Sequence, residues 1–246
     1  MQQERTHGPL VRTPVSLPLE TRKGTYVVIA AFNEAATIGG VLSELLAAGF
    51  PYVVVVDDGS SDRTRARARA GGAITLRHVI NRGQGAALQT GIAYALAAGA
   101  DVIVTFDADG QHCADDVPYL VEPIASGRAA IALGSRFAGR SIGMPRSRRW
   151  LLHLGRWFTF LSSGVLLSDA HNGLRAFSRE AAQGFDIRLD RMAHASELID
   201  QVRRTGLAWV EVPVRVRYTA YSRAKGQRSW GAFRIALDYL LGKWLR

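Results

Sequence analysis

Residues 26–60 read YVVIAAFNEAATIGGVLSELLAAGFPYVVVVDDGS, and this stretch decides the fold. Two runs rich in β-branched residues, Tyr26–Ala31 and Tyr52–Val56, have the length and composition of buried strands. Between them, Glu34–Ala48 has a helical pattern and is followed by Gly49, a residue typical of helix ends. Strand, helix and strand in this order predict a right-handed βαβ unit with two parallel strands.

The same alternation continues to about residue 135. The further predicted strands are Ile74–Val79, Val102–Phe106 and Ala129–Leu133, and the further predicted helices are Asp62–Ala70, Ala86–Ala98 and Asp115–Ala125. Continuous apolar runs are typical of strands that are buried on both faces, as in parallel sheets. The sequence therefore predicts an α/β protein whose doubly wound, mostly parallel sheet is flanked by helices.

The chain has 246 residues, which allows one large domain or two small ones. We expect residues 1–24 to form a flexible N-terminal arm, since prolines lie there among polar residues. Residues 25–246 are expected to form a single domain, in which residues 136–246 complete a site on residues 25–135 instead of folding alone. The elements expected in this second part are a basic loop at 136–149, a helix at Trp150–Leu167, a strand at Leu174–Phe177, a helix at about Ala193–Thr205, a strand at Ala208–Val216 and an amphipathic helix at about Trp230–Leu245.

The net charge of the chain indicates which chemical classes of partner it suits. Lys and Arg number 31 against 21 Asp and Glu, and the resulting formal net charge of +10 favours a nucleotide, a nucleic acid or an anionic bilayer. The one cysteine, Cys113, excludes an internal disulfide and a cysteine-based zinc cluster. The sequence shows neither an apolar run of about 20 residues nor a signal peptide, so we expect a cytoplasmic protein.

Polar residues at the carboxyl ends of the strands are candidate site residues, because ligands of open parallel sheets bind there. The first strand leads into Phe32, Asn33 and Glu34, which either contact a nucleobase or cap the following helix. The second leads into Asp57 and Asp58, adjacent carboxylates that repel each other unless a donor or a cation satisfies them. A base N–H or a ribose hydroxyl would serve, whereas a capping turn explains only part of this segment.

A glycine turn, Asn81-Arg82-Gly83-Gln84-Gly85, follows the third strand and opens a helix. Such a turn presents backbone N–H groups that suit a phosphate. It matches the dinucleotide-binding fingerprint poorly, because it follows the third strand and lacks the third glycine of that fingerprint. The sequence therefore argues against an NAD-type site.

The fourth strand ends in Phe106-Asp107-Ala108-Asp109-Gly110-Gln111-His112. Asp107, Asp109 and Gln111 alternate along the chain, so a curled turn would bring three oxygen ligands to one hard cation, Mg²⁺ or Mn²⁺. A cation held there would stabilise a diphosphate leaving group. The alternative is an aspartate-rich turn that caps the next helix.

Taken together, these motifs resemble those of family 2 glycosyltransferases. The matching segments are Ala31–Glu34, Val56–Asp62, Asn81–Gly85, Asp107–His112, Gly134–Phe137, Asp169–Arg175 and Glu211–Val214. The resemblance covers about residues 25–235 and is strongest to dolichyl-phosphate mannosyltransferase and related polyprenyl-phosphate sugar transferases. It implies a GT-A fold and an inverting, metal-dependent transfer from a UDP- or GDP-sugar. Residues 25–135 would then be the nucleotide-sugar-binding part, and residues 136–246 the acceptor-side and basic amphipathic part.

The resemblance also implies roles for individual residues. Phe32, Glu34, Asp57 and Asp58 match positions that line the nucleoside pocket. Asp107, Asp109 and Gln111 match the metal-binding triplet, Asp109 counts as catalytic, and Arg136 matches an arginine near the phosphates. The other residues expected to contact substrate are Ala31, Asn81, Gly85, Ala108, Asp169, Asn172 and Arg228. The chain departs from the family at Gln84, where related chains often have lysine.

The chemistry of the acceptor decides whether a base is needed. A hydroxyl acceptor requires a carboxylate within hydrogen-bond reach, and Glu197 is the candidate because related chains carry an acid there. A polyprenyl phosphate is already ionised and would need arginines instead. The alternative for Glu197 is a solvated helix glutamate. Asp169 and Asn172 lie in a segment that resembles an acceptor-facing loop, with an ordinary turn as the alternative.

Basic and aromatic residues of the second part suit a membrane surface. The arginines of residues 136–149 lead into the aromatic helix at Trp150–Leu167, so we expect peripheral contact with the inner face of a membrane. Packing against the main domain is the alternative. The segment Tyr218–Trp230, which contains Arg228, resembles a basic loop that closes over the diphosphate in relatives.

The leading hypothesis is a glycosyltransferase whose acceptor is a polyprenyl phosphate or a cell-surface glycan. A basic nucleic-acid-binding module is the rival from another class, but it rests on net charge alone, so we expect no nucleic-acid partner. A sugar nucleotidyltransferase on a similar sheet would carry a glycine-rich loop after the first strand, where Ala31–Glu34 stands. The sequence leaves the sugar, the choice between Mg²⁺ and Mn²⁺ and the oligomeric state open.

Overall fold

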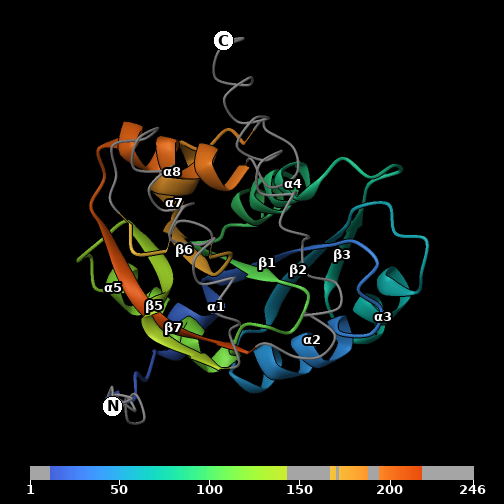
Figure 1. Ribbon diagram of the computed structural model, residues 1–246, viewed down its shortest axis with the longest axis horizontal. Helices are drawn as coiled ribbons and strands as arrows, with labels where there is room; N and C mark the ends of the chain where they lie inside the picture. The colour runs from blue at the N-terminus through green and yellow to red at the C-terminus, as the bar shows by residue number, and fades with distance from the viewer. Residues whose placement is uncertain (1–11, 143–166, 170–171, 188–193, 218–246) are drawn as a thin grey trace, which may run out of the picture.

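A computed structural model describes residues 12–142, 167–169, 172–187 and 194–217. These residues form a seven-stranded sheet with the order β3-β2-β1-β4-β6-β5-β7 (Figure 1). The strands are β1 (Thr25–Ala31), β2 (Tyr52–Asp57), β3 (Ile74–Arg77), β4 (Val102–Asp107), β5 (Ile131–Ile142), β6 (Arg175–Ser178) and β7 (Trp209–Arg217). The helices are α1 (Leu19–Lys23), α2 (Ile38–Ala47), α3 (Thr64–Ala70), α4 (Gln84–Ala97), α5 (Val117–Ala125), α7 (Arg179–Gln183) and α8 (His194–Thr205), with a 3₁₀ turn at Ala114–Asp116.

The first half of the sheet is parallel, as the βαβ pattern predicts. β1 lies between β2 and β4 and is parallel to both, and β3 extends the sheet beyond β2. In the second half, β6 is antiparallel to both β4 and β5, while β7 runs parallel to β5. The prediction of a doubly wound, mostly parallel α/β sheet is confirmed.

The sheet has an apolar core on each face because its central strands are apolar at nearly every position. Side chains of α2, α3 and α5 pack on one face, where Val27 and Val55 point. Side chains of α4, α7 and α8 pack on the other face, where Val28 and Val54 point (Figure 1). Burial of both faces explains why the strands read as continuous runs of valine and isoleucine instead of alternating with polar residues.

Three local predictions need correction. The N-terminal arm expected over residues 1–24 includes helix α1, and Leu17 is buried in the core, because Arg22 ties this segment to the Ala48 carbonyl at 2.8 Å. The basic loop expected from residue 136 begins as strand: β5 runs to Ile142 because it pairs with β7 on both sides of an irregularity between Ser135 and Arg140. The helix expected over Glu34–Ala48 begins later, because α2 starts at Ile38.

Several predicted elements lie outside the described residues. They are the aromatic helix up to residue 166, the segment Tyr218–Trp230 with Arg228, and the terminal helix at Trp230–Leu245. Each helix in the described ranges is too short or too polar to cross a lipid bilayer. The expected membrane contact therefore stays a prediction.

Asp116 joins three distant segments, and its replacement should lower stability. Its fully buried carboxylate accepts hydrogen bonds from the Arg215 backbone N–H at 2.6 Å, from Arg215 Nε at 3.0 Å and from Arg12 Nη1 at 3.3 Å. Asp116→Ala is expected to lower the free energy of unfolding by about 2–4 kcal/mol, because buried donors lose their acceptor. Urea denaturation followed by circular dichroism measures this loss.

The neighbouring aspartate is the matched control. Asp115 pairs with the same arginine at 3.5 Å, but its side chain is 80% exposed. Asp115→Ala should change stability by less than about 0.5 kcal/mol, since exposed ion pairs contribute little. Equal losses in the two variants would contradict the role given to Asp116.

Candidate active site

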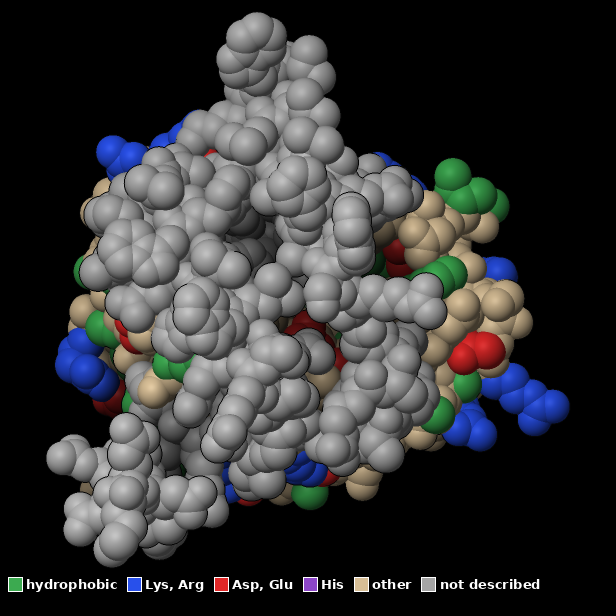
Figure 2. Space-filling model, viewed as in Figure 1, with side chains coloured by type: hydrophobic (Ala, Val, Ile, Leu, Met, Phe, Trp, Pro, Cys, Tyr) green, Lys and Arg blue, Asp and Glu red, His purple; other side chains and the backbone are tan. Residues whose placement is uncertain are grey.

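The carboxyl ends of β1, β2 and β4 meet at one edge of the sheet. Ala31 is in register with Asp57 of β2, and Ala30 is in register with Asp107 of β4. The polar residues that follow these strands therefore start from neighbouring positions. In the space-filling view, acidic side chains are visible near the centre of the face, where Figure 1 draws the ends of the central strands (Figure 2).

Asp57 and Asp58 were expected to line one nucleoside pocket, and their side chains leave the strand on opposite faces. Asp57 lies on the α3 side, where its Oδ1 accepts from the Ser60 backbone N–H at 3.1 Å. Asp58 lies on the α4 side, where its carboxylate accepts from the backbone N–H groups of Arg82 and Gly83 at 2.9 and 2.7 Å. His78 Nδ1 lies 2.7 Å from the same carboxylate. Asp58 therefore fixes the glycine turn that begins α4.

The loop after β1 is fastened to the loop after β2. Asn33 has a left-handed backbone with a φ of 54°, its N–H donates to Ser60 Oγ at 3.0 Å, and its Oδ1 accepts from the Ser61 N–H at 3.0 Å. These contacts explain why Asn33 does not cap α2. Glu34 is buried and accepts a hydrogen bond from Thr37 at 3.0 Å, whereas Phe32 is 43% exposed. Phe32 thus presents an aromatic face at the strand end, as stacking on a base requires.

Asp107 is held by donors on both of its oxygens. Its Oδ1 accepts from Gln84 Nε2 at 3.2 Å, and His112 Nε2 lies 2.9 Å from its Oδ2. Gly173 lies close to the same carboxylate: a Cβ at position 173 would lie 2.4 Å from each oxygen of Asp107. Gln84, the residue that departs from the family, is therefore a direct neighbour of a predicted metal ligand.

Asp109 lies beside Asp107 in a negative environment. Burial and the charge of Asp107 raise the pKa of Asp109 to about 6, with a further increase from Glu34. The Gln111 backbone N–H, which donates to Asp109 at 3.0 Å, and His112 act in the opposite direction. Two carboxylates that resist ionising together are a site that a cation would stabilise.

Arg175 is a buried cation behind this acidic pair. Its Nε donates to the Asn172 carbonyl at 2.9 Å, and burial lowers its pKa to about 10 despite the opposing charges of Asp107 and Asp169. A guanidinium with this pKa stays charged at neutral pH. Arg175 therefore offsets part of the negative charge of Asp107 and Asp169.

Arg136 and Asp169 form a buried pair. Asp169 Oδ2 accepts from the backbone N–H of Arg136 at 3.0 Å and from its Nε at 2.6 Å, and Asn172 Nδ2 lies 3.4 Å away. Glu211 of β7 in turn accepts from the Ser168 N–H at 2.8 Å. The structure thus brings Arg136, Asp169 and Asn172 together, and it shows Asp169 orienting Arg136.

The remaining predicted residues lie as follows. Ala31 and Ala108 are buried beside the strand ends, Gly85 is buried in the first turn of α4, and Asn81 is exposed in the turn before it. Glu197 is only 5% exposed in the first turn of α8, which excludes the solvated alternative. The described contacts do not place the Gln111 amide on the carboxylates, so its part in a metal site stays a prediction.

A divalent cation fits the residues present. In the described part of the chain, no three His, Cys, Asp or Glu side chains form a complete metal site. Asp107 and Asp109 supply two carboxylates, however, and Mg²⁺ commonly takes one or two carboxylates and completes its shell with phosphate oxygens and water. The raised pKa of Asp109 is the expected property of such a pair without its cation.

Sequence reasoning missed Arg175, His112 and Gly173 as site residues. An arginine at the start of a predicted buried strand was the available signal for Arg175, because a buried charge needs partners. His112 is only 3% exposed and packs edge-on against Phe106. Nothing in the sequence alone predicts that Gly173 touches Asp107.

Residues 26–185 match the family model described as glycosyl transferase family 2. The chain belongs to glycosyltransferase family 2. Its expected resemblance and its assignment as a nucleotide-sugar glycosyltransferase are confirmed.

Relatives and solved structures refine this placement. The UDP-N-acetylglucosamine–dolichyl-phosphate N-acetylglucosaminyltransferase of Methanococcus voltae is 32% identical, over 89% of this chain and 95% of that protein. The undecaprenyl-phosphate mannosyltransferase of Micrococcus luteus is 31% identical, over 76% of this chain and 81% of that protein. The fold is similar to that of glucosyl-3-phosphoglycerate synthase from Mycobacterium tuberculosis in complex with Mn²⁺ and UDP-glucose, at 22% identity and a TM-score of 0.70, over 92% of this chain and 83% of that one. The predicted GT-A fold is confirmed.

The raised pKa of Asp109 predicts how the stability of the glycosyltransferase depends on pH. Between pH 3.8 and about 6 the folded chain binds more protons than the unfolded chain, so the free energy of unfolding decreases as the pH rises through this range. Asp109→Asn removes this penalty. Without divalent cations at pH 7.5, the variant is expected to be about 2 kcal/mol more stable than the original protein.

Urea denaturation at pH 4 and pH 7.5 in a chelating buffer measures the difference. The two proteins should differ by less than about 0.6 kcal/mol at pH 4, where Asp109 is protonated in the folded state and about half ionised in the unfolded state. A variant that is less stable than the original at pH 7.5 would contradict the repulsion between Asp107 and Asp109.

Proposed function

We propose that this glycosyltransferase moves a sugar, with inversion, from a UDP- or GDP-sugar to a polyprenyl phosphate. The observation that carries the proposal is the pairing of Asp107 with Asp109 at the end of β4, where burial and mutual repulsion raise the pKa of Asp109 to about 6. Such a pair suits a divalent cation, Mg²⁺ or Mn²⁺, bound together with a diphosphate. When bound, the cation neutralises the charge that develops on the departing nucleoside diphosphate.

The side chains around the pair orient it for this task. Gln84 and His112 hold the two oxygens of Asp107, so the carboxylate keeps one direction. Phe32, exposed at the end of β1, is proposed to stack on the base, and Glu34 and Asp57 are proposed to bond the nucleoside. Preorganised groups of this kind act without the cost of reordering during the reaction.

Two buried arginines suit an anionic acceptor. Arg136 is held by Asp169, and Arg175 lies between the charges of Asp107 and Asp169. The proposed acceptor oxygen belongs to a phosphate, which is already ionised and attacks the anomeric carbon from the side opposite the diphosphate. Two relatives that the chain covers over most of their length are named for transfer to dolichyl phosphate and undecaprenyl phosphate, which supports this acceptor over a cell-surface glycan.

The effect of replacing Glu197 distinguishes a phosphate acceptor from a hydroxyl acceptor. If the acceptor is a phosphate, Glu197→Gln should keep transfer within about threefold, because no base has to take a proton. A hydroxyl acceptor would depend on the base, and the same variant would then lose about 10²–10⁴-fold. Turnover of the original protein and of Glu197→Gln, measured side by side with a lipid phosphate and with a glycan hydroxyl, distinguishes the two cases.

A screen of donors and acceptors tests the proposal as a whole. UDP- and GDP-sugars are incubated with the full chain, Mn²⁺ or Mg²⁺, and undecaprenyl phosphate in detergent, and the lipid product is detected by mass spectrometry. At least one donor should give a sugar monophosphate lipid together with released UDP or GDP. Transfer to a glycan hydroxyl and none to the lipid phosphate would contradict the acceptor.

A peripheral position at the inner face of a membrane is proposed together with this acceptor, since a polyprenyl chain lies in the bilayer. The excess of ten positive charges supports it. Flotation of the full chain with phosphatidylglycerol vesicles measures the association, and failure to float at low salt would contradict it.

A further inference from the structure

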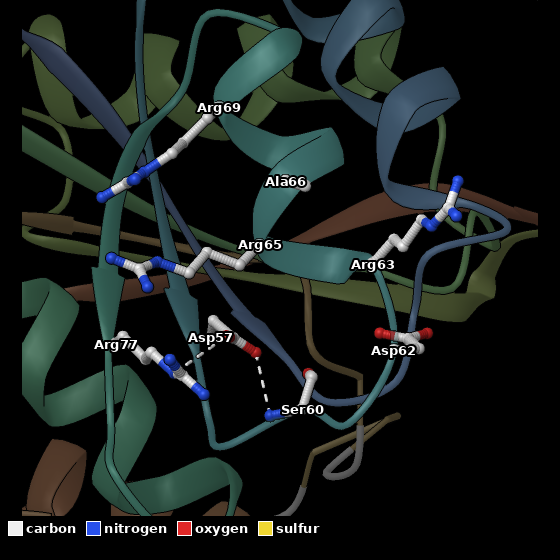
Figure 3. Close-up of a pocket in the computed structure, with 8 residues that line it drawn as sticks. All are labelled: Asp57, Ser60, Asp62, Arg63, Arg65, Ala66, Arg69 and Arg77. Carbon is white, nitrogen blue, oxygen red and sulfur yellow. Dashed lines mark hydrogen bonds and ion pairs between the residues drawn. The ribbon is translucent and has the colours of Figure 1, made fainter.

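A hollow lies on the face of the sheet that α3 covers. It has a volume of about 330 Å³ and is lined by the loop after β2, by α3 and by β3 (Figure 3). Four arginines, Arg63, Arg65, Arg69 and Arg77, contribute to the lining. Asp58 and Asp107 contact the opposite, α4 side of the sheet, through the turn before α4 and through Gln84. The hollow is therefore separate from the acidic pair.

The arginines of the hollow exceed its carboxylates in number. Asp62 is engaged by the Thr64 N–H at 2.8 Å and by the Ala35 N–H at 3.1 Å. Asp57 accepts from Ser60 and lies 3.8 Å from Arg77 Nε. Within the described ranges, no carboxylate lies at ion-pair distance from Arg65 or Arg69. The positive charges of Arg65 and Arg69 are thus not offset by a carboxylate of the described residues.

Arg65 and Arg69 lie four residues apart, on one face of α3. Like charges at this spacing destabilise a helix, and α3 contains no acidic residue to offset them. Figure 3 shows Arg65 and Arg69 extending from α3 to the side where Arg77 of β3 lies, while Arg63 points to the other side. Lys and Arg side chains also project from the edge of the molecule where Figure 1 labels α3 (Figure 2).

Arg65 carries the observation that points to a ligand. Its Nε is buried, and the described residues give it no hydrogen-bond partner. Buried donors without a partner are rare in folded proteins, because each loses its bonds to water without compensation. The hollow therefore lies beside two arginines without a carboxylate partner and beside a buried N–H group, Arg65 Nε, without a hydrogen-bond partner in the described part of the chain.

We propose that this hollow binds a phosphate group. Arg65 and Arg69 donate to its oxygens, for which the planar guanidinium is suited, and Arg77 is positioned by the buried Asp57. The site goes beyond the proposed function, because the diphosphate of the donor belongs to the Asp107 and Asp109 side of the sheet. It adjoins the proposed nucleoside contacts, since Asp57 lines the hollow as well. The phosphate belongs either to a small soluble compound or to a phospholipid headgroup, and two arms of one experiment distinguish these sources.

The experiment compares the full chain with the double variant Arg65→Gln/Arg69→Gln. Arg67→Gln is the matched control, because Arg67 lies on the same helix but bonds the Ala35 carbonyl and does not line the hollow. One arm titrates inorganic phosphate by calorimetry with chelator present, so that divalent cations make no contribution. The other arm measures sedimentation with vesicles of phosphatidylglycerol in phosphatidylcholine, against vesicles of phosphatidylcholine alone.

The double variant is expected to bind at least about tenfold more weakly in one arm, because two charge-assisted contacts are lost. Arg67→Gln should stay within about twofold in both arms. Loss with inorganic phosphate assigns a soluble ligand, and loss with anionic vesicles alone assigns a headgroup. No binding by the original protein in either arm, or an equal loss in Arg67→Gln, would overturn the proposal.

Nucleotide binding distinguishes this site from the donor site. Affinity for UDP or GDP with Mn²⁺ should stay within about twofold in the double variant, whereas a larger loss would make the hollow part of the donor site and overturn the proposal. Arg69→Gln alone, at an exposed position, replaces the double variant if circular dichroism shows that the latter does not fold.

Discussion

Replacing Asp109 with alanine is expected to lower sugar transfer by at least about 10³-fold, because it removes one of the two carboxylates proposed to hold the cation that neutralises the departing diphosphate. The ionised carboxylate lowers the stability of the fold, since its pKa is raised by burial and by Asp107. Loss of activity should therefore come without loss of fold. The rate of UDP or GDP release at saturating Mn²⁺, measured beside the melting temperature, tests both statements.

Asp115→Ala is the control for this change, since Asp115 lies six residues further along the chain and is exposed. It removes the same charge from the protein and should keep turnover within about twofold, because it does not touch the site. Full activity in Asp109→Ala would contradict the proposed cation site, whether or not Asp115→Ala keeps its activity.

Gly173→Ala is expected to lower kcat by about 10²-fold, because the added methyl group displaces a predicted metal ligand. A Cβ at this position would lie 2.4 Å from both oxygens of Asp107, which is far inside van der Waals contact. Asp107 is also held by Gln84 and His112, so it cannot turn away without breaking those contacts. A shift of about 1 Å in a reacting group is enough for a loss of this size.

Titration of activity with Mn²⁺ measures the effect of Gly173→Ala on the site. The concentration of Mn²⁺ at half-maximal rate should rise together with the loss of kcat. Gly39→Ala is the control, because nothing lies within 4 Å of a Cβ at that position in α2. An unchanged Mn²⁺ dependence in Gly173→Ala would show that Asp107 does not hold the cation.

The central part of the fold follows from local patterns, which explains why it could be predicted. β1, β2 and β4 are continuous apolar runs, and the helices between them end at glycines, so each element is determined by its own residues. The register of parallel strands then places Asp57 and Asp107 at one edge of the sheet without further information. The positions of Asp57 and Asp107 could therefore be inferred from the sequence before the contacts of their carboxylates were known.

The part that could not be predicted depends on contacts between distant segments. β5 extends through a basic stretch because β7, more than 60 residues later, pairs with it. The adjacent Asp57 and Asp58 read as one motif, yet strand geometry sends them to opposite faces and to different partners. Glu211 holds the Asp169 segment by a contact across 43 residues, and no local pattern indicates it.

Gln84 illustrates how a departure from a family becomes interpretable through structure. In the sequence it is only the place where related chains often have lysine. In the structure its amide donates to Asp107, so the side chain orients a carboxylate in a position where a lysine would add charge. The amide and the buried Arg175 together show how this chain distributes charge around the acidic pair.

Calorimetric titration of UDP and GDP into the full chain, with Mn²⁺ and with chelator, tests the central claim most directly. The claim is that Asp107 and Asp109 bind a diphosphate through a divalent cation. At least one nucleotide should bind at least about tenfold more tightly with Mn²⁺, because without the cation the carboxylates repel its phosphates. Equal affinity in the presence of chelator would contradict the account.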